Sequence, residues 1–181
     1  MATARSGLFS ALSLGATAVH YFGHAGTEQW ADEDLLTVDD TASLAGTPLT
    51  LVFTWACEGQ FYQNVFGPSL GEALVLVPNG GARASFGPAG ITDPQRQRSL
   101  YSRLYQDWIA AGLPLGEAIR RAKAEALAAD PASRPVVDGW NLLGDPALGA
   151  RPSAHPRSAS VGEWPSWNEH ASATSRPRSE R

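Results

Sequence analysis

The chain has 181 residues, of which 43% are hydrophobic and 9% aromatic, and its formal net charge at pH 7 is -4. This length suits one globular domain, and disordered chains are poorer in apolar and aromatic residues. The excess of acidic over basic residues leaves no overall positive field, so the composition argues against nucleic acid as a partner.

The N-terminal part of the chain predicts a helix and two strands. Residues 8–14 have a helical pattern, and residues 17–22 form a predicted strand that ends at Gly23. The apolar run over residues 49–55 is typical of a strand covered on both faces. The acidic segment between these strands, residues 28–40, lacks the spacing and the sixth-position glycine of an EF-hand. We therefore expect a solvated acidic loop there, with no metal ion.

The middle of the chain continues the alternation of helices and strands. Ser69 is placed to cap a helix over residues 70–77, and residues 82–86 form a third predicted strand. A loop rich in glycine and proline follows over residues 87–94. Because loops at the carboxyl ends of parallel strands carry the ligand sites of α/β proteins, this loop is a candidate binding region.

The C-terminal part predicts two amphipathic helices and a tail. Residues 95–111 and 115–129 have apolar side chains at helical spacing. Strands that alternate with helices predict an α/β fold with a mainly parallel sheet and helices on both faces. We expect one domain over residues 1–149 and a disordered tail, rich in proline, serine and arginine, over residues 150–181.

Nothing in the sequence predicts a membrane span. No stretch approaches the roughly 20 apolar residues that such a helix needs. The mildly apolar run over residues 8–19 is interrupted by polar residues and lacks a clear cleavage site. We therefore identify no export signal, and the sequence assigns no cellular compartment.

Cys57 is the single cysteine of the chain, which excludes an intrachain disulfide and a zinc-binding cysteine cluster. A free thiol becomes a nucleophile when a neighbouring imidazole takes its proton at neutral pH. His24 and Cys57 each follow a predicted strand and have small neighbours, which let a substrate backbone approach. Since neighbouring parallel strands end at the same edge of a sheet, we expect these two side chains to lie close together. His20, inside its strand, is expected to pack or hydrogen-bond rather than to catalyse.

Six short motifs follow one another along the chain. They are VHYFGHAG over residues 19–26, TWACEGQF over 54–61, SLGEAL over 69–74, GGA over 80–82, LGEAI over 115–119 and LGDPAL over 143–148. Their residues, order and spacing resemble those of gingipain-type cysteine peptidases, and the resemblance covers residues 16–148. Each motif alone is common, but six in one order make the resemblance specific.

The resemblance implies a caspase-like three-layer α/β/α sandwich and a cysteine-type endopeptidase that needs no cofactor. Such an enzyme hydrolyses a polypeptide substrate through a thioester acyl-enzyme, with His24 as general base and Cys57 as nucleophile. The backbone N–H groups of Ala25 and Cys57 would hold the oxyanion. One wall of the substrate pocket of the family maps onto the loop residues Gly87, Pro88, Ala89 and Gly90.

Two features depart from the family pattern. Ala25 stands where the family usually has glycine, and the strands that precede the histidine strand in the family have no counterpart here. We therefore expect a sheet that is incomplete at the N-terminus and is completed by a partner or by a missing N-terminal segment. Two alternatives stay open, namely a caspase-related CHAT-type peptidase and a non-catalytic remnant or binding domain of the same fold. The family is often exported.

Overall fold

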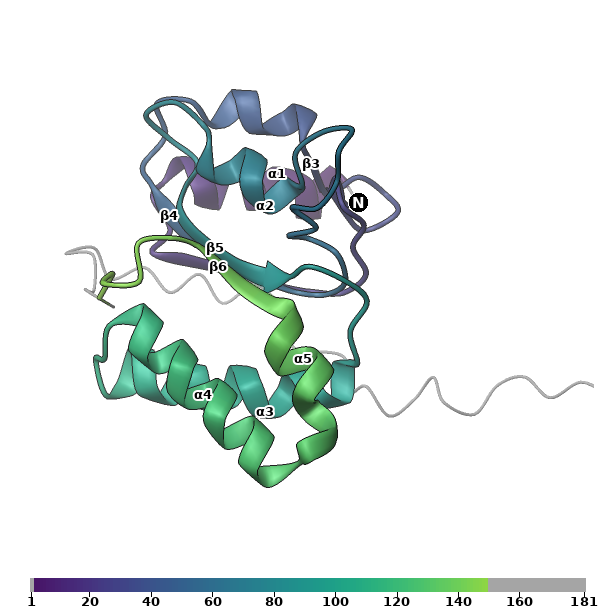
Figure 1. Cartoon of the computed structure of the whole chain (residues 1–181). Helices are drawn as coiled ribbons and strands as arrows, with labels where there is room; N and C mark the ends of the chain where they lie inside the picture. Colours follow the sequence, from purple (N-terminus) through teal and green to yellow (C-terminus); the bar gives the residue numbers. More distant parts are fainter. Residues whose placement is uncertain (1, 150–181) are drawn as a thin grey trace, which may run out of the picture.

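The structure, a computed structural model, describes residues 2–149. A four-stranded sheet with the order β1-β4-β5-β6 forms its centre (Figure 1). Strands β1 (Ala18–Phe22), β4 (Thr50–Trp55) and β5 (Ala82–Pro88) are parallel, and β6 (Trp140–Gly144) is antiparallel to β5. The predicted α/β fold with a mainly parallel sheet is confirmed. The tail predicted over residues 150–181 lies outside the described residues.

Helices cover both faces of this sheet. Helices α1 (Ala2–Ser13) and α2 (Leu70–Val75) lie on one face, and α3 (Pro94–Tyr105), α4 (Leu115–Ala129) and α5 (Arg134–Gly139) lie on the other (Figure 1). The result is the three-layer sandwich that the sequence predicted. Within residues 2–149 no helix combines the length and the apolar character that crossing a lipid bilayer would require.

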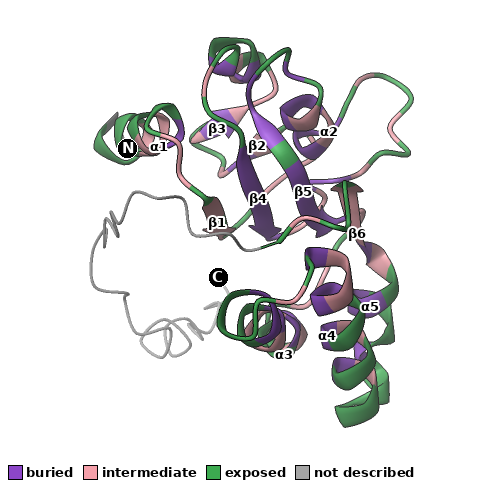
Figure 2. Cartoon of the chain, turned by 90° about the vertical axis from the view of Figure 1, so that its left-hand side faces the viewer, coloured by how far each residue is buried: buried purple, intermediate pink, exposed green. Residues whose placement is uncertain are grey.

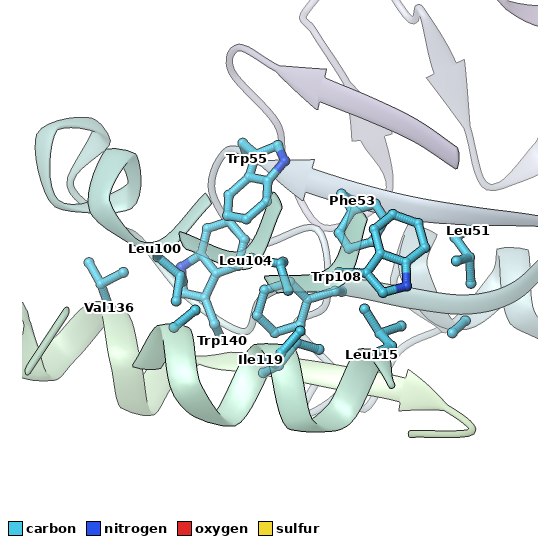
Figure 3. Packing of buried hydrophobic residues seen from close by; sticks show 14 residues of the cluster. Leu51, Phe53, Trp55, Leu100, Leu104, Trp108, Leu115, Ile119, Val136 and Trp140 are labelled. Carbon is cyan, nitrogen blue, oxygen red and sulfur yellow. The ribbon is translucent and has the colours of Figure 1, made fainter. Parts of the chain in front are cut away.

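Strand β4 is buried along its whole length, as its apolar run predicted (Figure 2). Leu51, Phe53 and Trp55 face the layer of α3 and α4, where they pack among apolar side chains from both helices (Figure 3). Val52 faces the other way, into a second core under α1 and α2. Because successive side chains of a strand point to opposite faces, one strand supplies both cores.

The acidic segment folds instead of remaining a solvated loop. It contains β2 (Gln29–Trp30), β3 (Leu36–Thr37) and a 3₁₀ helix, Asp39–Leu44. Asp40 in that helix pairs with Arg5 of α1, with 2.5 Å between the two side chains. The expectation of a solvated loop is therefore wrong for Asp40, because the carboxylate holds the first helix to the rest of the domain.

Several boundaries differ from the prediction. Helix α1 starts well before residue 8, and the helix predicted over residues 95–111 ends in a π-helical turn, Gln106–Ala110. β5 extends two residues further than predicted. The short 3₁₀ turn Pro131–Ser133, α5 and β6 were not predicted, because these brief elements carry too few periodic positions.

Candidate active site

Parallel pairing brings His24 and Cys57 to the same end of the sheet. Phe22 of β1 pairs with Trp55 of β4 at the last position of their ladder. Each candidate residue follows its strand by two positions, and neighbouring strands lie about 4.8 Å apart. The structure therefore agrees with the prediction that the histidine loop and the cysteine loop are neighbours.

The backbone of the histidine loop is held at its carbonyl groups. The carbonyl oxygen of His24 accepts hydrogen bonds from the hydroxyl of Tyr21 at 2.6 Å and from the N–H of Ala31 at 2.8 Å. A Cβ at Gly23 would lie 2.6 Å from that hydroxyl, so a larger residue there would displace the Tyr21 hydroxyl from the His24 carbonyl. His24 itself is exposed to solvent and is not packed into a core.

The N–H groups proposed for the oxyanion are free of backbone acceptors. Ala25 is opposite Trp30 in an antiparallel bridge whose hydrogen bonds are made by the residues on either side, so its own N–H points away from the bridge. Within residues 2–149 neither Ala25 nor Cys57 donates its N–H to a backbone carbonyl. Ala25 has no positive φ, so alanine fits at this position without strain.

The cysteine loop is tied to the loop that follows β5. The N–H of Glu58 donates to the carbonyl of Gly90 at 3.1 Å, and the N–H of Gln60 donates to that of Pro88 at 2.9 Å. Glu58 has a φ of 52°, an unusual value for a residue other than glycine, and it turns the chain immediately after Cys57. The backbone around the candidate nucleophile is thus fixed from one side.

The thiol of Cys57 is half-buried and faces the loop after β5. Its nearest hydrogen-bond acceptor is the carbonyl of Thr92, at 3.9 Å from Sγ. In the described part of the chain no hydrogen bond joins Cys57 to His24. The Thr92 hydroxyl accepts from Gln97 Nε2 at 3.3 Å and from Trp140 Nε1 at 3.5 Å, so the residue that meets the thiol is itself anchored.

Two surface depressions flank the two loops. An open one of about 580 Å³ is lined by His24, Ala25 and the following residues to Gln29, and by Asp32. A smaller one of about 220 Å³ is lined by Tyr62, Gln63, residues 88–92, Pro135 and residues 138–141. Of the four loop residues predicted to contact substrate, Pro88, Ala89 and Gly90 line the smaller depression, whereas Gly87 is buried within β5.

Sequence reasoning missed part of the smaller depression. Thr92 lies in the loop after β5 that the sequence predicted as a binding region, whereas Asp138 and Trp140 contribute from α5 and from the start of β6. The last two come from elements that were not predicted, so no signal pointed to them. A metal site is not indicated, since the described residues contain no group of three or more His, Cys, Asp or Glu side chains placed to hold an ion.

His20 has the packing role that was expected for it. Its ring stacks on Phe53 with 4.5 Å between centroids, and its Nδ1 accepts a hydrogen bond from Trp55 Nε1 at 3.1 Å. Burial lowers the pKa of His20 to about 4, so the ring is neutral at physiological pH. It faces the α3 and α4 layer, away from the substrate loops.

The sequence matches the model of peptidase family C25 over residues 1–151. Among solved structures the chain is similar to the Arg-specific cysteine proteinase gingipain R (RgpB), with 19% identity and a TM-score of 0.68, over 81% of this chain and 36% of that one. It is also similar to the complex of Porphyromonas gingivalis RgpB pro- and mature domains, with 18% identity and a TM-score of 0.65, over 80% and 36% of the two chains.

A third similar structure, described only as a protease, has 18% identity and a TM-score of 0.66, over 80% of this chain and 37% of that one. No curated protein sequence matches the chain. At these identities the likeness establishes the shared caspase-like fold. The chain spans 36–37% of the length of the solved structures that it matches.

Proposed function

This chain belongs to peptidase family C25, and from that membership we propose that Cys57 and His24 are the nucleophile and the general base of a cysteine peptidase. The observation that supports the proposal is the parallel register of β1 and β4, which ends both strands at the same edge of the sheet, two residues before His24 and two residues before Cys57. The family match favours the gingipain type over the CHAT-type alternative.

The chemistry proceeds by acyl transfer. His24 takes the proton of the Cys57 thiol, the sulfur forms a bond to the substrate carbonyl carbon, and the tetrahedral oxyanion accepts hydrogen bonds from the N–H groups of Ala25 and Cys57. The C–N bond then breaks as His24 returns the proton to the leaving amine. Water hydrolyses the thioester by the same route, with His24 as base, and regenerates the thiol.

In the structure the Cys57 thiol contacts the Thr92 carbonyl rather than His24. Catalytic hydrogen bonds are often long in free enzymes and tighten when substrate binds. The proposed reaction needs the thiol to leave Thr92 and turn toward His24, while Gly90 and Pro88 hold the backbone of the cysteine loop. A polypeptide substrate would lie across the thiol, with the residues on one side of the scissile bond in one depression and those on the other side in the other depression.

Alkylation of the purified chain by iodoacetamide tests the pair. The chain has one cysteine, so its mass reports the reaction of Cys57 directly. We expect Cys57 to react faster than free cysteine at pH values near 7, because His24 as general base would take the thiol proton, and we expect His24→Ala to abolish the difference. His20→Asn is the matched control, since it removes a histidine that packs on Phe53 within β1 rather than in the loop that follows the strand.

Two results contradict the proposal. The first is a Cys57 that reacts no faster than free cysteine, and the second is an equal rate in the chain and in His24→Ala. Either result would leave the chain as a non-catalytic domain of the same fold. Cleavage of a fluorogenic peptide library by the chain, with Cys57→Ala as the blank, then measures whether the reactive pair turns over substrate.

A further inference from the structure

We propose that Tyr21, Trp30 and Thr54 form a bridge beneath the site that fixes the histidine loop relative to the cysteine loop. The proposal rests on the proposed function, because it assigns these three side chains as positioning residues for the Cys57–His24 pair. None of them lines either depression. Their contacts join the two loops through the core on the α2 side of the sheet.

The first end of the bridge holds the histidine loop. The Tyr21 hydroxyl donates to the carbonyl of His24 at 2.6 Å, and the Tyr21 ring stacks on Trp30 with 4.6 Å between centroids and 6° between planes. Trp30 also pairs with Ala25 through its backbone. Two independent contacts therefore connect Trp30 with the residue proposed as base and with the residue proposed as oxyanion donor.

The centre of the bridge is a hydrogen bond between two buried side chains. Trp30 Nε1 donates to Thr54 Oγ1 at 3.2 Å, and the two residues are 1% and 2% exposed. A buried indole N–H without an acceptor costs free energy, so this bond fixes the rotamer of both side chains. Phenylalanine could fill most of the same space, which means that packing alone does not require a donor at this position.

The second end meets the cysteine loop. A Cβ added at Gly59 would lie 2.7 Å from the Thr54 methyl group, so this methyl packs directly against the backbone of the cysteine loop two residues after Cys57. The carbonyl of Gly59 is also fixed, because it accepts from the N–H of Gly71 at 2.9 Å. A change in the Thr54 rotamer would therefore shift the loop that carries the nucleophile.

The test measures the acceleration due to His24, defined as the alkylation rate of Cys57 divided by its rate in the matching His24→Ala variant. We expect Trp30→Phe and Thr54→Val each to lower this ratio by about fivefold or more, the factor that one hydrogen bond typically carries. The double variant should lower it no further, since both changes remove the same bond. Thr54→Ser, which keeps the hydroxyl, should retain more of the ratio than Thr54→Val.

Tyr21→Phe tests the first end of the bridge separately and with little risk to folding, because it removes only the hydroxyl that donates to the His24 carbonyl.

The matched control for Trp30→Phe is Trp108→Phe. Trp108 is also 1% exposed, but it lies in the core on the opposite face, and among residues 2–149 its Nε1 has no hydrogen-bond partner. We expect this control to lower the melting temperature and to leave both the His24-dependent ratio and its pH profile unchanged.

The outcomes separate the two proposals. If the unaltered chain shows His24-dependent acceleration and Trp30→Phe, Thr54→Val and Tyr21→Phe all keep it, the bridge is refuted while the proposed function stands. A fall in the ratio that is equal in Trp108→Phe also refutes the bridge, because general loosening would then explain it. If the unaltered chain shows no His24-dependent acceleration, both proposals fail.

Discussion

The stability of this domain should fall at mildly acidic pH because of one histidine. His20 lies on the edge strand β1, where its neutral ring stacks on Phe53 and accepts the indole N–H of Trp55. A protonated imidazole has no lone pair left for that bond. Protonation would therefore leave the N–H of Trp55 without its acceptor and place a positive charge against apolar rings.

The sign follows from the pKa of His20, which burial lowers from 6.5 in the unfolded chain to about 4 in the folded one. Between these values the unfolded chain binds more protons, so the free energy of unfolding rises with pH in this window. The loss begins as pH falls below 6.5 and is complete below about 4. The full difference corresponds to roughly 3 kcal/mol. The ring of His20 lies against Phe53, but the residue on this edge strand is still exposed to solvent, which screens the charge, so we expect about 1–2 kcal/mol.

Urea denaturation followed by circular dichroism, at a series of pH values from about 4 to about 7.5, measures this effect. The matched variant is His20→Asn, whose side-chain oxygen keeps an acceptor near Trp55 but does not titrate. Carboxylates titrate in both proteins, so the difference between their pH profiles isolates His20. Parallel profiles for the chain and the variant would refute the argument, whereas a steeper profile for the chain supports it.

Three further predictions concern the packing of the backbone. Ser69→Ala should cost about 1 kcal/mol of unfolding free energy, because the Ser69 hydroxyl accepts a hydrogen bond from the backbone N–H of Glu72 in the first turn of α2. Gly80→Ala should cost about 1–3 kcal/mol, since its Cβ would lie 2.0 Å from the carbonyl oxygen of Leu44, whereas Gly7→Ala in α1 meets nothing within 4 Å and serves as its control; equal melting temperatures would contradict this. Gly71→Ala should slow alkylation of Cys57 although alanine favours helices, because its Cβ would lie 2.9 Å from a backbone oxygen of the cysteine loop; an unchanged rate would contradict this.

The sequence predicted the elements that carry a long periodic signal and missed those that do not. The helix over Leu115–Ala129 and the buried strand β4 follow directly from their patterns. Such strands usually pair in parallel, so the sequence also predicted that the strands before His24 and Cys57 end at the same edge of the sheet. The parallel pairing of β1 and β4 agrees with this. The short α5 and β6 have only a turn or a few residues each, and their antiparallel return beside β5 left no trace in the local pattern.

The orientation of the thiol illustrates what a sequence pattern does not contain. Cys57 meets Thr92, a residue 35 positions later, and Thr92 in turn is held by Trp140, another 48 positions along the chain. These contacts depend on how the loop after β5 folds back over the end of β4, which is decided by tertiary packing rather than by local preference.

Glycine positions connect the stability of the fold with the geometry of the site. The cysteine loop lies against β4 and α2 so closely that Gly59 and Gly71 leave no room for a Cβ. Glycine costs conformational entropy on folding, so these positions lower stability in order to let two backbones approach. The absence of a Cβ at Gly59 lets the methyl group of Thr54 contact the cysteine loop, while the Thr54 hydroxyl accepts a hydrogen bond from Trp30 Nε1. Trp30 also pairs with Ala25 of the histidine loop. A substitution at Trp30 or Thr54 should therefore alter the reactivity of Cys57 although neither side chain contacts substrate.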